Sequence, residues 1–349
     1  MKRMLLMAAI AAIVAVPAWA FHDGGVAHCN GCHTMHNSQD GELVDPDSPD
    51  GNPFLLIESP SSDICLNCHA TRLGNSMGGG TGMDPLAPGN LYGGGQFIFL
   101  TENNLNDGHG GATDPISGDA AGHNIISDAY SIAQDATLTT SPGGGFPSQF
   151  LSCASCHDPH GNQNFRLLHD SATRPGYTNP APTAIGIGIF GAGEGLTNHT
   201  AYQSGMSAWC GNCHGDFHNN NTQLIHPSGR AMGGTQSGIY NLYNGSVDIT
   251  GGAAATAYLP EVAFEDPANT TTSTAGPAAS SQVSCISCHR AHASSAPDAG
   301  RWDFSVTFLH EDGVESGSYQ IPDPYNNLSQ RSLCNKCHAK DVYDLPFAP

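Results

Sequence analysis

Cys29-Asn30-Gly31-Cys32-His33 is the first of six copies of one pattern, Cys-x-x-Cys-His, and the six copies contain every cysteine of the chain. The other copies are Cys65-Leu66-Asn67-Cys68-His69, Cys153-Ala154-Ser155-Cys156-His157, Cys210-Gly211-Asn212-Cys213-His214, Cys285-Ile286-Ser287-Cys288-His289 and Cys334-Asn335-Lys336-Cys337-His338. This pattern is the attachment motif of haem c. In a helical turn, residues i, i+3 and i+4 share a face, so two thiols bond the haem while the histidine reaches the iron. The sequence predicts six covalent haems, with the motif histidines as proximal ligands.

Zinc sites and disulfides also use Cys-x-x-Cys pairs. Histidine makes up 18 of the 349 residues. Six histidines would follow six such pairs by chance with a probability of roughly 10⁻⁸, which leaves haem attachment as the interpretation of the motif.

The first twenty residues have the pattern of an export signal. Lys2 and Arg3 precede an apolar stretch over 4–16, and Ala18-Trp19-Ala20 is an A-x-A cleavage site. We expect a signal peptide over 1–20, removed after Ala20, and a single domain from Phe21 to Pro349. The apolar run is too short to span a membrane, and no later stretch approaches 18 apolar residues. The expected location is extracellular or at the cell surface, with the periplasm as the alternative.

The composition is unusual for a globular protein. Leu, Ile, Val and Phe are roughly 18% of the residues, and the chain has 43 glycines and 23 prolines. Such a composition is typical of disorder unless the haems themselves form the core. The predicted fold is therefore mostly irregular, with short helical turns around stacked haems and little β-structure. Strand is expected over 96–100 and a short helix over 124–134.

The charge is strongly negative. Without residues 1–20, nine Lys and Arg face 31 Asp and Glu, a net charge of −22. This surface repels nucleic acid and anionic membranes and favours cations, minerals or basic partners, although it also suits a secreted protein that only needs solubility. The acidic run over 45–51 resembles a calcium loop but lacks the bidentate glutamate, and we interpret it as a solvated turn.

Twelve histidines outside the motifs decide between electron transfer and catalysis. A haem iron with histidine on both faces is closed, whereas a catalytic haem keeps one face open. Three candidates follow a motif histidine by three residues and cannot reach the far face of the same iron, so each is expected to serve a neighbouring haem. A fourth follows by four residues, and three more lie in loops. The candidates are His36, His160, His292, His218, His22, His123 and His226.

The remaining histidines are weaker candidates. His28 adjoins its own motif and His109 lies in a glycine-rich loop, so both are expected to be solvated. Three others are kept in reserve: His169, His199 and His310. Met35 and Met206 are alternative ligands that would raise the reduction potential, but the surplus of histidine favours ligation by histidine.

Several stretches resemble the OmcS-like family of extracellular hexahaem cytochromes, which polymerise into nanowires. Phe21-His22-Asp23-Gly24-Gly25-Val26-Ala27 and the following Gly31-Cys32-His33-Thr34-Met35-His36-Asn37-Ser38 are similar to the start of the mature family sequence. Further similar stretches run to the other end of the chain: Gly122-His123-Asn124-Ile125, Cys156-His157-Asp158-Pro159-His160-Gly161, Gly205-Met206-Ser207 with Trp209-Cys210, Cys288-His289-Arg290-Ala291-His292-Ala293-Ser294 and 333–341.

The resemblance implies six bis-histidine haems in a continuous stack and head-to-tail assembly into a filament. It also implies that His36 ligates the haem attached at Cys285, Cys288 and His289 of the neighbouring subunit. Seven histidines match six distal positions, so one is spare. Other cytochromes or extracellular electron acceptors are the expected partners.

The expected function is extracellular electron transfer through a conductive filament, without bond-making chemistry. A monomeric periplasmic shuttle with the same haems is an alternative. A multihaem reductase is a further alternative, but it would favour an open haem and basic residues for an anionic substrate, whereas all six motifs end in histidine and the chain is acidic.

Overall fold

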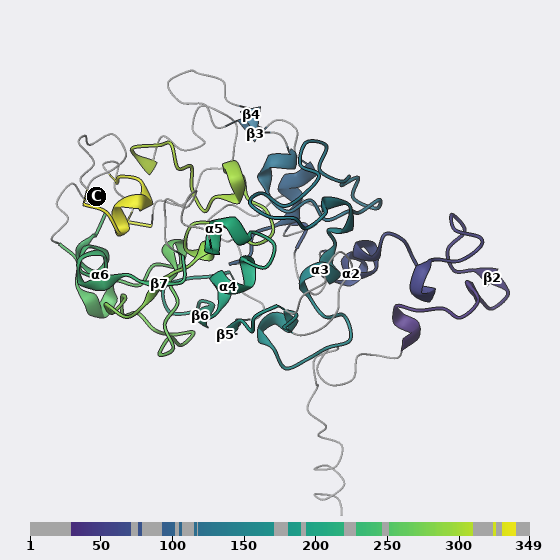
Figure 1. Cartoon of the computed structure of the whole chain (residues 1–349), viewed down its shortest axis with the longest axis horizontal. Coiled ribbons are helices and arrows are strands. Elements are labelled where there is room, and N and C mark those ends of the chain that lie inside the picture. Colours follow the sequence, from purple (N-terminus) through teal and green to yellow (C-terminus); the bar gives the residue numbers. More distant parts are fainter. Residues whose placement is uncertain are drawn as a thin grey trace, which may run out of the picture.

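The computed structural model describes residues 29–70, 76–78, 93–101, 105–106, 115–116, 118–170, 181–189, 193–219, 228–245, 251–309, 324–325 and 330–339. Irregular backbone dominates these residues (Figure 1), as the composition predicts. No helix within them is long and apolar enough to cross a membrane. The expected signal peptide lies outside the described residues.

Helical structure is confined to short pieces, and each of the six motifs overlaps one of them. The α-helices of the described residues are α2 (Ser61–His69), α3 (Cys153–Cys156), α4 (Met206–Cys210), α5 (Gly215–Asn219) and α6 (Gly233–Leu242). The 3₁₀ turns are Cys29–Gly31, Pro53–Leu55, Phe97–Thr101, Gly118–Ala121, Ser148–Phe150, Phe165–Leu167, Ala254–Thr256, Pro260–Val262, Cys285–Ser287, Pro297–Ala299 and Leu333–Lys336.

Two motifs begin with the same serine cap. The hydroxyl of Ser155 accepts the backbone N–H of Ser152 at 3.0 Å, and the hydroxyl of Ser287 accepts that of Ser284 at 3.1 Å. A hydroxyl three residues into the turn thus satisfies an N–H that the helix leaves without a partner. The local sequence Ser-Cys-x-Ser-Cys therefore starts the turn that carries the cysteines.

The strands of the described residues form four two-stranded antiparallel ribbons. They pair β1 (Ser38–Gln39) with β2 (Glu42–Leu43), β3 (Leu105–Asn106) with β4 (Pro115–Ile116), β5 (Ile185–Ile187) with β6 (Ala201–Ser204), and β7 (Arg230–Ala231) with β8 (Gln282–Val283).

Buried apolar residues form three small clusters in place of one large core. The first centres on Leu66 and the segment 97–100, the second on Tyr240 and Trp302, and the third on Met206 and Ile286. Motif cysteines pack at the edge of each cluster: Cys153 on the first, Cys288, Cys334 and Cys337 on the second, and Cys156 on the third. The apolar side chains therefore gather where the haems are attached.

Two expected elements are wrong in the structure. The segment 96–100 is not a strand, because Phe97–Thr101 is a 3₁₀ turn in which residues 97–100 are all buried. The segment 124–134 is not a helix: Ser127 and Ile132 form a β-bridge around a turn. The carboxylate of Asp63 accepts two backbone N–H groups of that turn, which a helix would use internally.

One helix lies away from the motifs, where only loop was expected. Helix α6 buries Tyr240, whose hydroxyl donates to the carbonyl of Val262 at 2.8 Å. Packing of this tyrosine offsets the low helix propensity of the three glycines of α6.

Residues 29–58 form an N-terminal arm that projects from one end of the molecule (Figure 1). It contains the first motif, the ribbon β1–β2 and the acidic run over 45–51. In that run, Asp45 accepts the backbone N–H of Asp47 at 3.0 Å and the side-chain amide of Asn52 at 2.8 Å. Among the described residues, no cluster of three or more His, Cys, Asp or Glu is arranged to hold a metal ion.

Candidate haem centres

The motifs have the geometry that covalent haem attachment needs. In five of them the N–H of the histidine donates to the carbonyl of the first cysteine at 2.8–3.0 Å, and the second motif lies in the helix α2. Both cysteines and the histidine thus share one helical turn. None of the twelve cysteines forms a disulfide in the structure, so both sulfurs of each motif are left for haem attachment.

Four motif histidines are oriented by a backbone carbonyl. The Nδ1 atoms of His33, His157, His214 and His289 lie 2.7–3.0 Å from the carbonyl oxygens of Phe54, Arg166, Pro142 and Asp298, respectively. A carbonyl only accepts, so Nδ1 carries the proton and Nε2 keeps its lone pair. This arrangement leaves Nε2 to bind iron and fits haem ligation.

Three of these carbonyls belong to a repeated left-handed turn that sequence reasoning missed. Phe54, Arg166 and Asp298 have φ of 59°, 53° and 56°. Each left-handed residue costs about 1–2 kcal/mol, so the neighbouring contacts must hold it in place. The sequence does contain a signal for two of these turns, because Asn52-Pro53-Phe54-Leu55-Leu56 is similar to Asn164-Phe165-Arg166-Leu167-Leu168.

The three turns bind their motifs through matching hydrogen bonds. The carbonyls of Cys32, Cys156 and Cys288 accept N–H groups from the residue just beyond each turn, Ile57, His169 and Arg301, at 2.7–3.1 Å. These are the three motifs that read Cys-x-x-Cys-His-x-x-His. Motifs one, three and five are therefore copies of one structural module.

His160 faces the motif histidine His33. Their rings are parallel to within 6°, with centroids 6.2 Å apart. A metal–imidazole bond is about 2 Å, so two imidazoles bound across one metal ion have centroids about 6 Å apart. The Nδ1 atom of His160 lies 3.8 Å from the carboxylate of Asp158, which directs Nε2 away from it. The pair fits the two axial ligands of the first haem.

His123 and the motif histidine His214 form a second pair, with ring centroids 5.9 Å apart and ring planes at 61°. The Nδ1 atom of His123 lies 2.8 Å from the carbonyl of Ala291, which leaves Nε2 for a metal ion. Burial lowers the pKa of His123 to about 4. The ring is therefore neutral at pH 7, as a ligand must be.

His292 lies near the motif histidine His157. The ring of His292 stacks on Phe97 at 4.4 Å, and its Nδ1 atom is 3.3 Å from the carbonyl of Gly95. Burial lowers the pKa of His292 to about 3, and the nearby His157 lowers it further. His292 is thus placed to serve the haem of the third motif.

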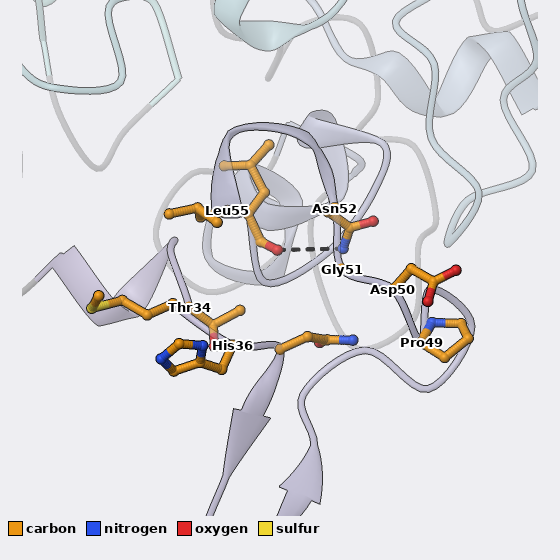
Figure 2. Close-up of a pocket in the computed structure, with 10 residues that line it drawn as sticks. Thr34, His36, Pro49, Asp50, Gly51, Asn52 and Leu55 are labelled. Atoms are coloured by element: carbon orange, nitrogen blue, oxygen red, sulfur yellow. Dashed lines mark hydrogen bonds between the residues drawn. The ribbon is translucent and has the colours of Figure 1, made fainter.

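His36 lies exposed on the N-terminal arm, beside an open hollow of about 280 Å³ lined by Thr34, Asn52 and Leu55 (Figure 2). Within the described part of the chain, His36 contacts no motif histidine. His218 packs instead between Gly211 and Gly229, where an added Cβ would lie 2.8 Å and 3.2 Å from it. His22 and His226 lie outside the described residues.

Two of the reserve histidines hydrogen-bond to backbone carbonyls. The Nε2 atom of His169 lies 3.0 Å from the carbonyl of Ala154. Both ring nitrogens of buried His199 face backbone carbonyls, and its ring stacks on Tyr258 at 3.8 Å. Met206 is buried in the third apolar cluster and Met35 is exposed on the arm. His28, His109 and His310 lie outside the described residues.

The motifs neighbour one another in the order of the chain. Helix α2 of motif two packs on α3 of motif three, and α4 at motif four packs on the turn Cys285–Ser287 of motif five. Cys156 packs on the third apolar cluster together with Trp209 beside motif four, and Cys288 packs on the second together with Cys334 and Cys337. Burial raises the pKa of Cys32 in motif one, and the nearby Cys65 of motif two raises it further. The six attachment sites therefore follow one continuous path.

No protein-family model matches the chain. The chain is 34% identical to the C-type cytochrome OmcS of Geobacter sulfurreducens, over 98% of this chain and 99% of that protein. Two solved structures of OmcS filaments are similar to this protein, each at 30% sequence identity. Each comparison covers 92% of this chain and all of the OmcS chain. Their TM-scores are 0.73 for the OmcS nanowires and 0.72 for the outer-membrane cytochrome S filament. The chain belongs to the OmcS family of c-type cytochromes, and its six motifs fit the attachment of haem c.

Proposed function

We propose that this protein conducts electrons outside the cell, through six bis-histidine haems and from one copy to the next in a head-to-tail filament. Bound haem c supplies a reversible one-electron iron couple. The observation that carries the proposal is the continuous path of the six motifs, from Cys32 to Cys337, in chain order. No bond-making step is required of the polypeptide, which positions, ligates and insulates the haems.

The histidine pairs suggest that residues 21–349 form three copies of a two-haem unit. Each unit reads histidine, then Cys-x-x-Cys-His-x-x-His, then Cys-x-x-Cys-His. The units start at His22, His123 and His226 and end at the motif histidines His69, His214 and His338.

Two relations between units follow from the contacts. In the second unit, the leading His123 faces the second motif histidine of its own unit, His214. The last histidine of each first motif reaches back one unit, since His160 faces His33 and His292 lies near His157.

These relations assign the remaining ligands. His22 would serve the haem at His69, and His226 the haem at His338. His36 has no earlier unit in its own chain, whereas the haem at His289 has no later unit to donate a ligand. His36 of one copy and His289 of the preceding copy therefore complete each other, and the filament continues the internal repeat. A heterologous contact of this kind need not close into a ring. His218 is the spare histidine.

The N-terminal arm supports contact with a second copy. Met35 and Phe54 expose 77% and 79% of their surface, and Leu55 exposes 54%. Large apolar side chains clustered on a surface indicate an interaction site. We also propose that residues 1–20 direct export of the protein. The acidic surface would then exchange electrons with other cytochromes or external acceptors.

Electron microscopy and EPR of the purified holoprotein test the proposal. We expect filaments and six low-spin haems. A monomeric shuttle would give low-spin haems without filaments, and a reductase would show a high-spin haem that binds added ligand within its working assembly. Either result would overturn the proposed function.

The ligand assignment makes a separate prediction. His226→Ala should convert one of six haems to the high-spin state, because it removes a distal ligand, whereas His218→Ala should leave all six low-spin. EPR and the visible absorption spectrum measure both. A high-spin haem in His218→Ala, with none in His226→Ala, would show that the unit pattern assigns the wrong spare histidine.

A further inference from the structure

Lys336, which lies between the two cysteines of the sixth motif, is fully buried. Its Nζ atom lies 4.4 Å, 5.3 Å and 5.9 Å from the ring centroids of Tyr240, Tyr325 and Tyr243. It donates to the hydroxyl of Tyr325 at 2.6 Å and to the carbonyl of Tyr243 at 3.1 Å. Among the described residues, no carboxylate contacts this ammonium group. Aromatic faces and neutral oxygens hold the positive charge instead.

Asp63 is the opposite case at the second motif. It is 2% exposed and stands in the first turn of α2, two residues before Cys65. Its carboxylate accepts the hydroxyl of Ser127 and the N–H groups of Asp128 and Ala129 at 3.1 Å and 3.2 Å. These partners are neutral, and no cation contacts it within the described part of the chain. The negative charge lies close enough to raise the pKa of the Cys65 thiol.

Motif five, by contrast, is surrounded by charges of both signs. The guanidinium of Arg301 donates to the carbonyl of Ile286 at 2.7 Å, within the motif. The buried carboxylate of Glu265 accepts the N–H of Ser207 at 3.3 Å and acts on the Cys285 thiol. Their effects on that haem oppose each other. The same carboxylate also acts on Cys210 of motif four, whereas Lys336 adjoins Cys337 of motif six and Asp63 precedes Cys65 of motif two by two residues.

We propose that Lys336 and Asp63 grade the reduction potentials along the chain, raising that of the haem at Cys337 and lowering that of the haem at Cys65. Reduction adds one electron and lowers the charge of a haem by one, so a nearby ammonium group favours the reduced state and a nearby carboxylate the oxidised state. In the protein interior, the low dielectric constant weakens screening by solvent. Within each subunit, electrons therefore collect at the C-terminal haem.

The size of the effect follows from Coulomb's law. A unit charge about 10 Å from an iron, at an effective dielectric constant of about 20, changes a one-electron equilibrium by about tenfold. A tenfold change is about 59 mV for one electron. The inference depends on the haem attachment sites but not on polymerisation, so it is tested equally well if the filament proposal fails.

The experiment is an optical redox titration of the holoprotein, with the haem count checked by mass spectrometry. Two variants remove the positive charge, Lys336→Met and Lys336→Gln, and one removes the negative charge, Asp63→Asn. Arg230→Gln is the matched control, because Arg230 is exposed on β7. The titration is run at pH 6, far below the ordinary pKa of a lysine side chain, so that the ammonium form is present.

Loss of Lys336 should lower the potential at the upper end of the titration curve. The shift should correspond to a change of about tenfold in the one-electron equilibrium constant, and it should be the same for Met and Gln. Asp63→Asn should move the lower end to higher potential, and Arg230→Gln should move neither. The proposal is overturned if six-haem variants give curves that superimpose on the unaltered protein. Unequal shifts for Lys336→Met and Lys336→Gln would overturn the proposal as well, because the change in potential would then depend on the new side chain and not on the lost charge.

Discussion

His36→Ala should produce a protein that carries six haems and does not polymerise. The substitution leaves every cysteine in place, so haem attachment is unaffected. In the proposed assembly it removes the imidazole that joins one copy to the iron at His289 of the preceding copy. One haem of six should become high-spin, and cryo-EM should show single molecules in place of filaments.

The control is His160→Ala, which deletes the equivalent histidine of the second unit. Its partner His33 lies in the same chain, so this variant should also show one high-spin haem but still form filaments. Added imidazole should return the haem of either variant to the low-spin state without restoring filaments to His36→Ala. Normal filaments from His36→Ala would refute the inter-subunit bond.

The chain without haem should be unfolded. Its three apolar clusters are small, and Leu, Ile, Val and Phe are only roughly 18% of residues, below the range that supports a packed core. In the holoprotein, two thioether links and the iron ligands of each haem restrict the unfolded chain and replace missing apolar contacts.

Far-UV circular dichroism of material produced without haem maturation tests this expectation. We expect the spectrum of a disordered chain and no cooperative thermal transition, whereas the holoprotein at the same concentration should show native signal and a transition. A cooperative transition in the haem-free chain would show that the polypeptide forms its own core.

Local sequence predicted the character of the fold better than its individual elements. Glycine and proline content correctly indicated an irregular backbone. The apolar run over 96–100 suggested a strand, but burial of residues 97–100 on all sides removes the alternation that a half-exposed strand needs. The turn over 127–131 depends on Asp63, which lies more than sixty residues away in the sequence.

The left-handed turns at Phe54, Arg166 and Asp298 show a similar limit. Non-glycine residues rarely adopt positive φ, so propensity alone argues against these turns. Their hydrogen bonds to a motif nine to 21 residues earlier hold them. The first turn is farther from its motif because the arm inserts β1–β2 and the acidic run between them.

The sequence by itself predicted how many haems the protein carries and where each would be attached, because attachment and proximal ligation need only two cysteines and a histidine on one helical turn. It also supplied more histidines than six irons require. Only the tertiary structure decided which histidine faces which motif, since His123 and His214, or His33 and His160, meet across about a hundred residues of chain. Ligation across an iron depends on the distance and orientation of two rings, and packing between distant segments sets both.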